Sequence, residues 1–151
     1  MDIKESFLQY IRTEKRYSRH TVTSYKNDLD QFMIWLEEIR PGADPVSVTH
    51  GDVRGWMVSL LEGGASAATV HRKMSALRAF FRYLRRHGMS SADPMSALKL
   101  PRKPRQLPEF VAEEALDRLL DDFKFGDDFS GLRDRTIVEF LYLTGMRRSE
   151  L

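Results

Sequence analysis

The sequence predicts an all-α protein. Apolar residues recur at three- and four-residue intervals along most of the chain, and no stretch shows the sustained two-residue alternation of a strand bounded by turn residues. Helix-capping Ser or Thr residues precede several of these stretches, and Gly or Pro residues follow them. With 42% hydrophobic residues and no cysteine in 151 positions, the chain can bury a core without disulfides, which excludes a secreted disulfide scaffold.

Two helices are expected first. One covers about residues 2–15, and the next begins after the N-cap Ser18 and stops ahead of Pro41-Gly42. The apolar residues of each fall on one sector of the helix: Ile3, Phe7 and Ile11 in the first, and Val22, Tyr25, Leu29, Phe32, Met33 and Leu36 in the second. The PGADPVSV segment that follows is expected to be a loop.

Capping signals mark two further helices. Thr49 followed three residues later by Asp52 resembles a capping box with Asp in place of the usual Glu or Gln, and Gly63-Gly64 ends the helix that it starts. Ser66 caps a fourth helix, which runs to about the residue before Gly88. Four helices of these lengths with short connections predict a compact bundle.

The fourth helix separates an apolar stripe from a basic face. At 100° per residue, the stripe lies within about 40° of Val70 and contains Val70, Met74, Leu77, Phe81 and Leu84. The basic face lies between roughly 60° and 200° and contains His71, Arg72, Ser75, Arg78, Arg82, Arg85 and Arg86, with Lys73 on the opposite flank. Three of these arginines are spaced four apart and repel one another, and no acid on the helix compensates. A merely solvated surface would mix the two signs of charge, so we expect contact with a phosphate backbone.

Charge is distributed unevenly along the rest of the chain as well. Residues 1–105 hold 18 basic and 11 acidic side chains, a net charge of +7, whereas residues 106–151 hold 6 and 11, a net charge of −5. Residues 71–105 alone carry ten basic side chains and one acid, Asp93. This concentration indicates a polyanionic partner. The pattern suits duplex DNA, although by itself it also fits RNA or an anionic membrane surface.

No membrane-spanning segment is expected. No run approaches 18 consecutive apolar residues, and the first ten residues, MDIKESFLQY, are charged where a signal peptide needs an apolar stretch. We therefore expect a soluble cytoplasmic protein.

A basic linker and part of a second domain are expected after the bundle. Four prolines interrupt the helical pattern up to Pro108, and residues 99–108 are predicted to be an extended interdomain linker. Helices are expected at about 112–122 and 130–144. The second is apolar on nearly all sides, which is typical of a helix at the centre of a larger domain. Only 43 residues follow Pro108, so we expect this domain to be truncated.

The last residues, Tyr142 to Leu151, read YLTGMRRSEL. A Gly at the end of a buried helix, followed by Arg, places a guanidinium at a tight turn where it could face a phosphate. Alone, this motif also fits an ordinary corner between two helices.

Three earlier blocks, however, make the whole chain resemble the tyrosine site-specific recombinases, in particular the Xer-type recombinases and the phage and mobile-element integrases. The four blocks are Phe7 to Leu36, Ser66 to Gly88, Asp93 to Phe110 and Leu132 to Leu151.

The resemblance implies a fold and a division into domains. Residues 1–98 would be a four-helix SAM-like core-binding domain that grips DNA, 99–108 the basic linker, and 109–151 the truncated start of the catalytic domain. Double-stranded DNA would be the partner, bound by Ser18, Arg19, His20, Thr21, His71, Arg72, Lys73, Ser75, Arg78, Arg82, Arg85, Arg86, Lys99, Arg102, Lys103 and Arg105.

The resemblance also implies a catalytic role for Arg147, which matches the first catalytic arginine of the family. It would bind the scissile phosphate and stabilise the negative charge that develops during attack. Arg148 occupies a variable position, and Glu150 would orient the turn. The family further requires a lysine, a His, a second Arg, another His or Trp and a nucleophilic Tyr, none of which can be assigned here. The five tyrosines present are expected to pack in cores: Tyr10, Tyr17, Tyr25, Tyr83 and Tyr142.

The full-length protein would therefore cut and rejoin DNA through a 3′-phosphotyrosine, within a homo- or hetero-tetramer and without a metal or other cofactor. This chain would associate with the nucleoid and bind DNA without completing catalysis. Two alternatives remain open. One is a stand-alone DNA-binding regulator or architectural protein derived from a recombinase. The other is a helical protein-interaction module, suggested only by Ile34, Trp35 and the Gly63-Gly64 corner.

Overall fold

The computed structural model describes residues 2–102, 112, 115, 118 and 122–151, and its regular elements over these residues are all helical. The chain divides into two compact units, residues 1–104 and 105–151. The elements of the first unit are α1 (Ile3–Thr13), α2 (Arg19–Ile39), the short 3₁₀ helix η1 (Pro45–Ser47), α3 (His50–Glu62) and α4 (Ala67–Arg86). The second unit contains α6 (Phe129–Thr144). The all-α prediction is confirmed, while the helix expected at 112–122 falls mostly outside the described residues.

The helix ends of the first unit follow from local hydrogen bonds. The hydroxyl of Ser18 accepts a hydrogen bond from the backbone N–H of Thr21 at 3.2 Å. Thr49 and Asp52 form the reciprocal capping box, each side chain accepting from the other residue's backbone N–H. Gly88 follows α4 with φ at +68°, a left-handed conformation that costs glycine little. The predicted starts of α2 and α3 are therefore confirmed.

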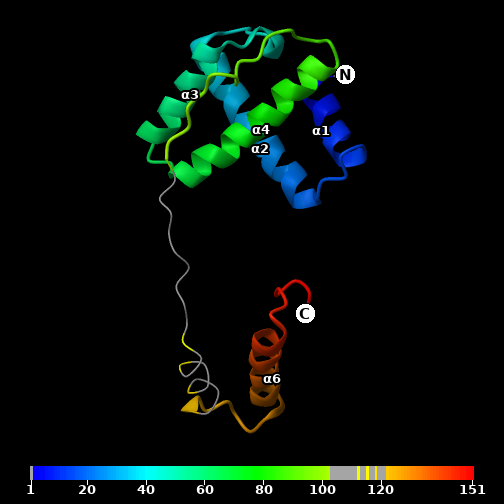
Figure 1. The fold of residues 1–151 in the computed structure, drawn as a ribbon, viewed down its shortest axis with the longest axis vertical. Helices are drawn as coiled ribbons and strands as arrows, with labels where there is room; N and C mark the ends of the chain where they lie inside the picture. The colour runs from blue at the N-terminus through cyan, green and yellow to red at the C-terminus, as the bar shows by residue number, and fades with distance from the viewer. Residues whose placement is uncertain (1, 103–111, 113–114, 116–117, 119–121) are drawn as a thin grey trace. The chain divides into compact units, whose positions relative to one another are not determined.

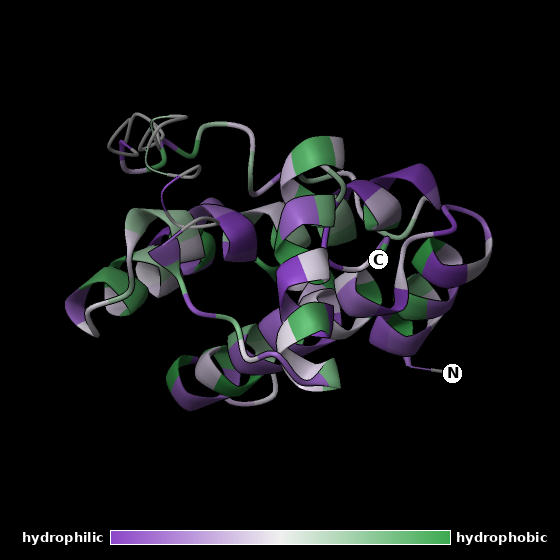
Figure 2. Ribbon diagram, turned by 90° about the horizontal axis from the view of Figure 1, so that it is seen from below, coloured by the Kyte–Doolittle hydropathy of each residue, from purple (hydrophilic) through white to green (hydrophobic). Residues whose placement is uncertain are grey.

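The core of the first unit forms where α2 and α4 cross, with α1 and α3 packed beside them (Figure 1). The apolar stripe predicted on α4 is buried along its whole length. Aromatic edges interlock across the helices, with ring centroids 5.4 Å apart for Phe7 and Phe80 and 5.1 Å apart for Phe32 and Trp56. Figure 2 shows the corresponding alternation of hydrophilic and hydrophobic residues along the helices. Each large apolar side chain buried in this way contributes about 1.5–3 kcal/mol.

The segment that follows α4 is attached to the bundle. Met95 is buried, and Leu98 and Leu100 pack against the core. Two histidine rings hydrogen-bond to proline carbonyls of this segment: Nδ1 of His50 lies 3.2 Å from the oxygen of Pro94, and Nε2 of His71 lies 2.7 Å from the oxygen of Pro101. The first residues of the expected linker, 99–102, therefore run along the first unit because these apolar and polar contacts hold them there.

The second unit is described chiefly by α6. The carboxylate of Asp128 accepts the N–H of Gly131 at 2.9 Å, and Gly145 ends the helix with φ at +63°. Gly131 is buried so closely against Gly126 that a Cβ on it would lie 1.9 Å from the Gly126 oxygen. Several large apolar residues of α6 are exposed, including Leu132 at 65% and Leu143 at 80%, whereas Ile137, Val138 and Leu141 are half-buried. The helix is thus apolar on most sides, as its sequence predicts, but little of the described unit covers it.

No helix in the described part of the chain is both long enough and apolar enough to cross a membrane.

Candidate nucleic-acid interface

Five arginines of α4 lie on the side of the helix opposite its buried apolar stripe. Arg72, Arg82, Arg85 and Arg86 are exposed, and Arg78 is half-buried. The core stripe holds the other side of α4 in place, so the backbone beneath these guanidinium groups is rigid. We call Arg72, Arg78, Arg82, Arg85 and Arg86 the α4 arginine face.

Arg72 and Lys73 share a buried carboxylate on α2. Asp28 is 1% exposed and forms ion pairs with the guanidinium of Arg72 and with Nζ of Lys73, the latter at 3.3 Å. Arg72 also donates to the hydroxyl of Ser24 at 2.8 Å, and Lys73 donates to the side-chain oxygen of Gln31. A buried carboxylate is costly unless it is paired, and these two cations supply the pairing.

Lys73 is consequently removed from the exposed basic surface. It is 6% exposed and its ammonium group faces α2 and the ring of Trp56, 5.7 Å from the ring centroid. Lys73, which the sequence predicts to contact DNA, is therefore largely buried, and its charge neutralises Asp28 inside the bundle. Arg72 differs because nearly half of its side chain remains exposed while it pairs with the same carboxylate.

The remaining arginines of the face are paired to different degrees. Arg85 forms an ion pair with Asp93 at 2.6 Å, and Arg86 donates to the hydroxyl of Tyr10 at 3.3 Å. Arg78 and Arg82 form no hydrogen bond or ion pair with any residue that the structure describes. They lie four residues apart, so their charges repel one another by a few tenths of a kcal/mol. No hydrogen bond or ion pair among the described residues therefore engages either guanidinium group, and both are available to an external anion.

A hollow of about 250 Å³ opens at the same place. Arg78, Arg82 and Arg85 line it from α4, and Asp93 and Ser96 are among the residues that line it from the segment after the helix. Three guanidinium groups outnumber the single carboxylate, so the hollow favours a negatively charged group.

The other predicted contacts differ in how available they are. Ser18, Arg19 and His20 are exposed at the start of α2, whose first turn contains no acidic residue, which favours an anion at this helix end. Thr21 is half-buried, and its hydroxyl lies 2.9 Å from that of Ser18. Lys99 and Arg102 are exposed, whereas Lys103 and Arg105 lie outside the described residues.

Two predicted contacts are engaged within the first unit. The hydroxyl of Ser75 donates to the backbone oxygen of His71 at 2.8 Å, and the His71 ring bonds to Pro101. The His71 ring therefore fastens the segment after the helix to α4, whereas the Ser75 bond lies within α4 itself.

Arg147 lies in the turn after α6. Its side chain is 82% exposed, its backbone N–H donates to Oε2 of Glu150 at 2.7 Å, and its guanidinium donates to Oε1 of the same residue at 3.0 Å. Glu150 thus holds both the turn and the arginine side chain. Arg148 is exposed beside it.

The five tyrosines differ in how deeply they are buried. Tyr83 is buried, and Tyr10 and Tyr25 are half-buried, in agreement with core packing. Tyr17 and Tyr142 are 40% and 38% exposed, so the core-packing expectation is wrong for these two. Tyr17 lies at the corner between α1 and α2.

Residues 5–88 match the family model of the phage integrase N-terminal SAM-like domain. The chain is 38% identical over 149 residues to the tyrosine recombinase XerC of Oceanobacillus iheyensis, an alignment that covers 97% of this chain and 47% of that protein. It is 33% identical over 147 residues to the tyrosine recombinase XerD of the same organism, with coverages of 97% and 49%. The chain therefore spans about half the length of these relatives.

Among solved structures, the chain is similar to the Tn1549 transposon integrase in complex with circular intermediate DNA. The TM-score is 0.62 at 22% sequence identity, over 99% of this chain and 48% of that one. At this identity the likeness establishes the shared helical fold.

Proposed function

The chain belongs to the family of the phage integrase N-terminal SAM-like domain, and we propose that it is the DNA-binding part of a site-specific tyrosine recombinase. The observation that carries the proposal is the α4 arginine face, in which Arg78 and Arg82 have no partner among the described residues. Guanidinium groups fixed on a rigid helix with no internal role are suited to the phosphates of double-stranded DNA.

The proposed contacts all belong to the first unit. The α4 arginine face and the hollow beside it would bind the phosphate backbone, and Lys99 and Arg102 would add charge from the adjoining segment. The start of α2, with Ser18, Arg19 and His20, would bind a further phosphate. Such contacts position the protein on DNA without reading its sequence, so we expect affinity for duplexes of any sequence.

The catalytic part of the proposal concerns Arg147. Its exposed guanidinium would bind the scissile phosphate, with Glu150 positioning it. The whole recombinase would cut and rejoin DNA through a 3′-phosphotyrosine within a tetramer, with no metal or other cofactor. It would act in the cytoplasm, at the nucleoid. Because no nucleophilic tyrosine can be assigned among these 151 residues, we expect this chain to bind DNA and leave it uncut.

Fluorescence anisotropy of a labelled duplex tests the proposal with the full chain. Affinity should fall steeply with salt, since each neutralised phosphate adds about 0.9 to the slope of log K against log salt concentration. The double variant R78E/R82E should weaken binding to all duplexes alike and lower this slope by about 2.

A matched control separates a specific surface from general charge. The double variant R54E/K124E makes the same change in net charge at exposed residues outside the α4 arginine face. Equal losses in the two double variants, or binding that does not depend on salt, would overturn the proposal.

A further inference from the structure

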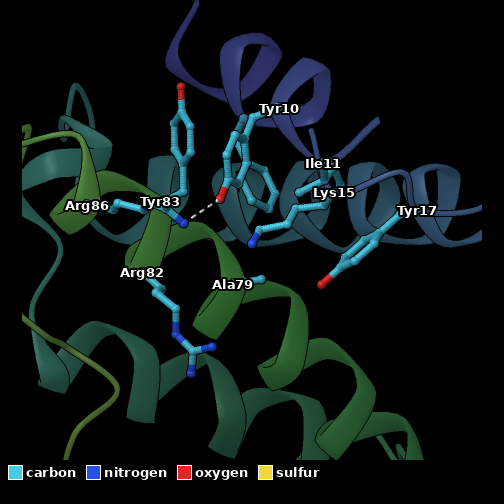
Figure 3. Close-up of a pocket in the computed structure, with 9 residues that line it drawn as sticks. Tyr10, Ile11, Lys15, Tyr17, Ala79, Arg82, Tyr83 and Arg86 are labelled. Atoms are coloured by element: carbon cyan, nitrogen blue, oxygen red, sulfur yellow. Dashed lines mark hydrogen bonds between the residues drawn. The ribbon is translucent and has the colours of Figure 1, made fainter. Parts of the chain in front are cut away.

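A pocket of about 160 Å³ lies beside the α4 arginine face, between α1, the corner that follows it, and the second half of α4 (Figure 3). Its walls are aromatic. Tyr10 and Tyr83 lie with ring centroids 5.0 Å apart, and the exposed Tyr17 forms the opposite edge. Ile11 and Ala79 provide apolar surface between them.

The pocket is also strongly basic. Nζ of Lys15 lies 5.8 Å from the centroid of the Tyr10 ring, and Arg86 holds the Tyr10 hydroxyl. Arg82 lines the pocket from α4, and none of the lining residues is acidic. In Figure 3, the Lys15 side chain and the Tyr17 ring both extend from the corner toward α4. Three cations around aromatic surface favour a planar group that carries a negative charge.

The backbone of the corner is strained in a way that serves this arrangement. Arg16 has φ at +52°, and it is the only residue other than glycine with positive φ in the described part of the chain. This conformation is unfavourable for a side chain with a Cβ, and such strain concentrates at functional positions. The backbone N–H groups of Lys15 and Tyr17 donate to the oxygens of Tyr10 and Ile11, at 3.2 and 3.0 Å. The corner therefore holds Lys15 and Tyr17 on the two sides of Arg16 at the mouth of the pocket.

We propose that this pocket binds a single unpaired pyrimidine nucleotide, with its base against the tyrosine rings and its phosphate toward Arg82 and Arg86. Its volume is close to that of a cavity of about 150 Å³ that holds one benzene ring, which suits a six-membered ring better than a purine. The inference rests on the proposed function, because Arg82 belongs both to the pocket and to the surface assigned to the DNA backbone. The nucleotide could be part of a distorted DNA strand or free in solution.

Three duplexes of one sequence test the proposal in anisotropy measurements with the full chain. One is fully paired, one carries a single bulged thymidine, and one carries an abasic bulge with the same flexible backbone. Base stacking on tyrosine predicts that the thymidine bulge binds on the order of tenfold tighter than the abasic bulge. Equal affinity for the two bulges would show that flexibility alone is recognised, and it would overturn the proposal.

Variants test whether the preference for the thymidine bulge depends on residues of the pocket. Tyr17→Ala should abolish the preference for the thymidine bulge while leaving affinity for the paired duplex unchanged. Tyr142→Ala, which removes another exposed tyrosine, should retain the preference. Because Tyr17 also contacts the ring of Tyr25 at 6.0 Å, Lys15→Met provides a second test, with Lys124→Met as its charge-matched control. A preference that survives both Tyr17→Ala and Lys15→Met would overturn the proposal.

Competition by thymidine monophosphate distinguishes the two sources. Competition at micromolar concentrations, lost in Tyr17→Ala, would assign the pocket to a free nucleotide; its absence, with a preserved bulge preference, would assign it to DNA. Either result supports a pyrimidine nucleotide as the ligand. Failure to bind the paired duplex would instead count against the proposed function itself.

Discussion

Helices α4 and α6 are both rich in apolar residues, but the structure uses them in opposite ways. On α4 the apolar residues occupy one stripe and are buried, and the other face is basic. On α6 the apolar residues point in most directions, and only Gly131 is buried among the described residues of that helix. On α4, the helical spacing of apolar residues correctly predicts which side chains are buried, because the other helices of the first unit pack against them. On α6, a similar content of apolar residues leaves exposed apolar surface, because little of the described second unit packs against it.

The largest expected difference in stability is between a buried residue of α4 and an exposed residue of α6. Phe80 on α4 is fully buried, so Phe80→Ala should lower the free energy of unfolding by about 3–5 kcal/mol. Leu143 on α6 is 80% exposed, so Leu143→Ala should change it by less than about 0.5 kcal/mol. Urea denaturation followed by far-UV circular dichroism measures both. A comparable loss for Leu143→Ala would mean that α6 is covered by contacts that its exposure does not reveal.

Removal of the buried carboxylate of Asp28, which pairs with Arg72 and Lys73 of α4, should have the next largest effect on stability. Asp28→Ala leaves Lys73 buried without its counter-charge, and we expect a loss of about 3 kcal/mol in the same denaturation experiment. The double variant D28L/K73M replaces the pair with apolar side chains and should recover much of that loss. If the double variant is as unstable as the single one, the carboxylate acts through Arg72 and Ser24 rather than through Lys73.

The sequence alone predicts the elements of the first unit well because the relevant signals are local. A hydroxyl of Ser18 or Thr49 reaches a backbone N–H three residues away, and the apolar stripe of α4 repeats every turn. The partners of the basic residues are not local. Asp28 lies 44 residues from Arg72 in the sequence. An isolated helical wheel therefore sets Lys73 on the flank opposite the basic face but cannot show the carboxylate with which it pairs.

The pocket escapes sequence reasoning for the same reason. It joins Tyr10 to Arg86, 76 residues apart, and depends on the left-handed conformation of Arg16, which no residue type at that position signals. Of the candidate interface, the sequence therefore predicts the helix and the sign of its charge. Which arginines are already paired follows only from the tertiary contacts.

A smaller change in the free energy of unfolding is expected when the pH is lowered. Burial raises the pKa of Asp52, but hydrogen bonds from Thr49 and the charge of Arg40 outweigh it and hold that pKa below its ordinary value of 3.8. A carboxyl whose pKa is lowered by folding stabilises the fold above its ordinary pKa, and the contribution is lost as the pH falls through the folded-state pKa. Asp52→Asn should therefore cost about 1 kcal/mol at pH 7.

Thermal or urea denaturation at a series of pH values checks this expectation. The stability difference between the wild type and Asp52→Asn should hold from pH 7 to about 5 and shrink as the pH falls below 3.8. Asp127→Asn, at an exposed position, serves as the control. A difference that persists unchanged to pH 2 would assign the effect to packing rather than to the charge of Asp52.

The smallest effect on stability distinguishes the paired from the unpaired arginines of α4. Arg78→Met keeps the aliphatic stem but removes a charge that repels Arg82, so the free energy of unfolding should stay the same or rise by a few tenths of a kcal/mol. Arg85→Met breaks the exposed ion pair with Asp93 and should lower it by a few tenths. Both variants should weaken binding to duplex DNA. A loss of stability in Arg78→Met equal to that in Arg85→Met would show that Arg78 supports the fold, and the claim that it is held in place for an external phosphate would no longer stand.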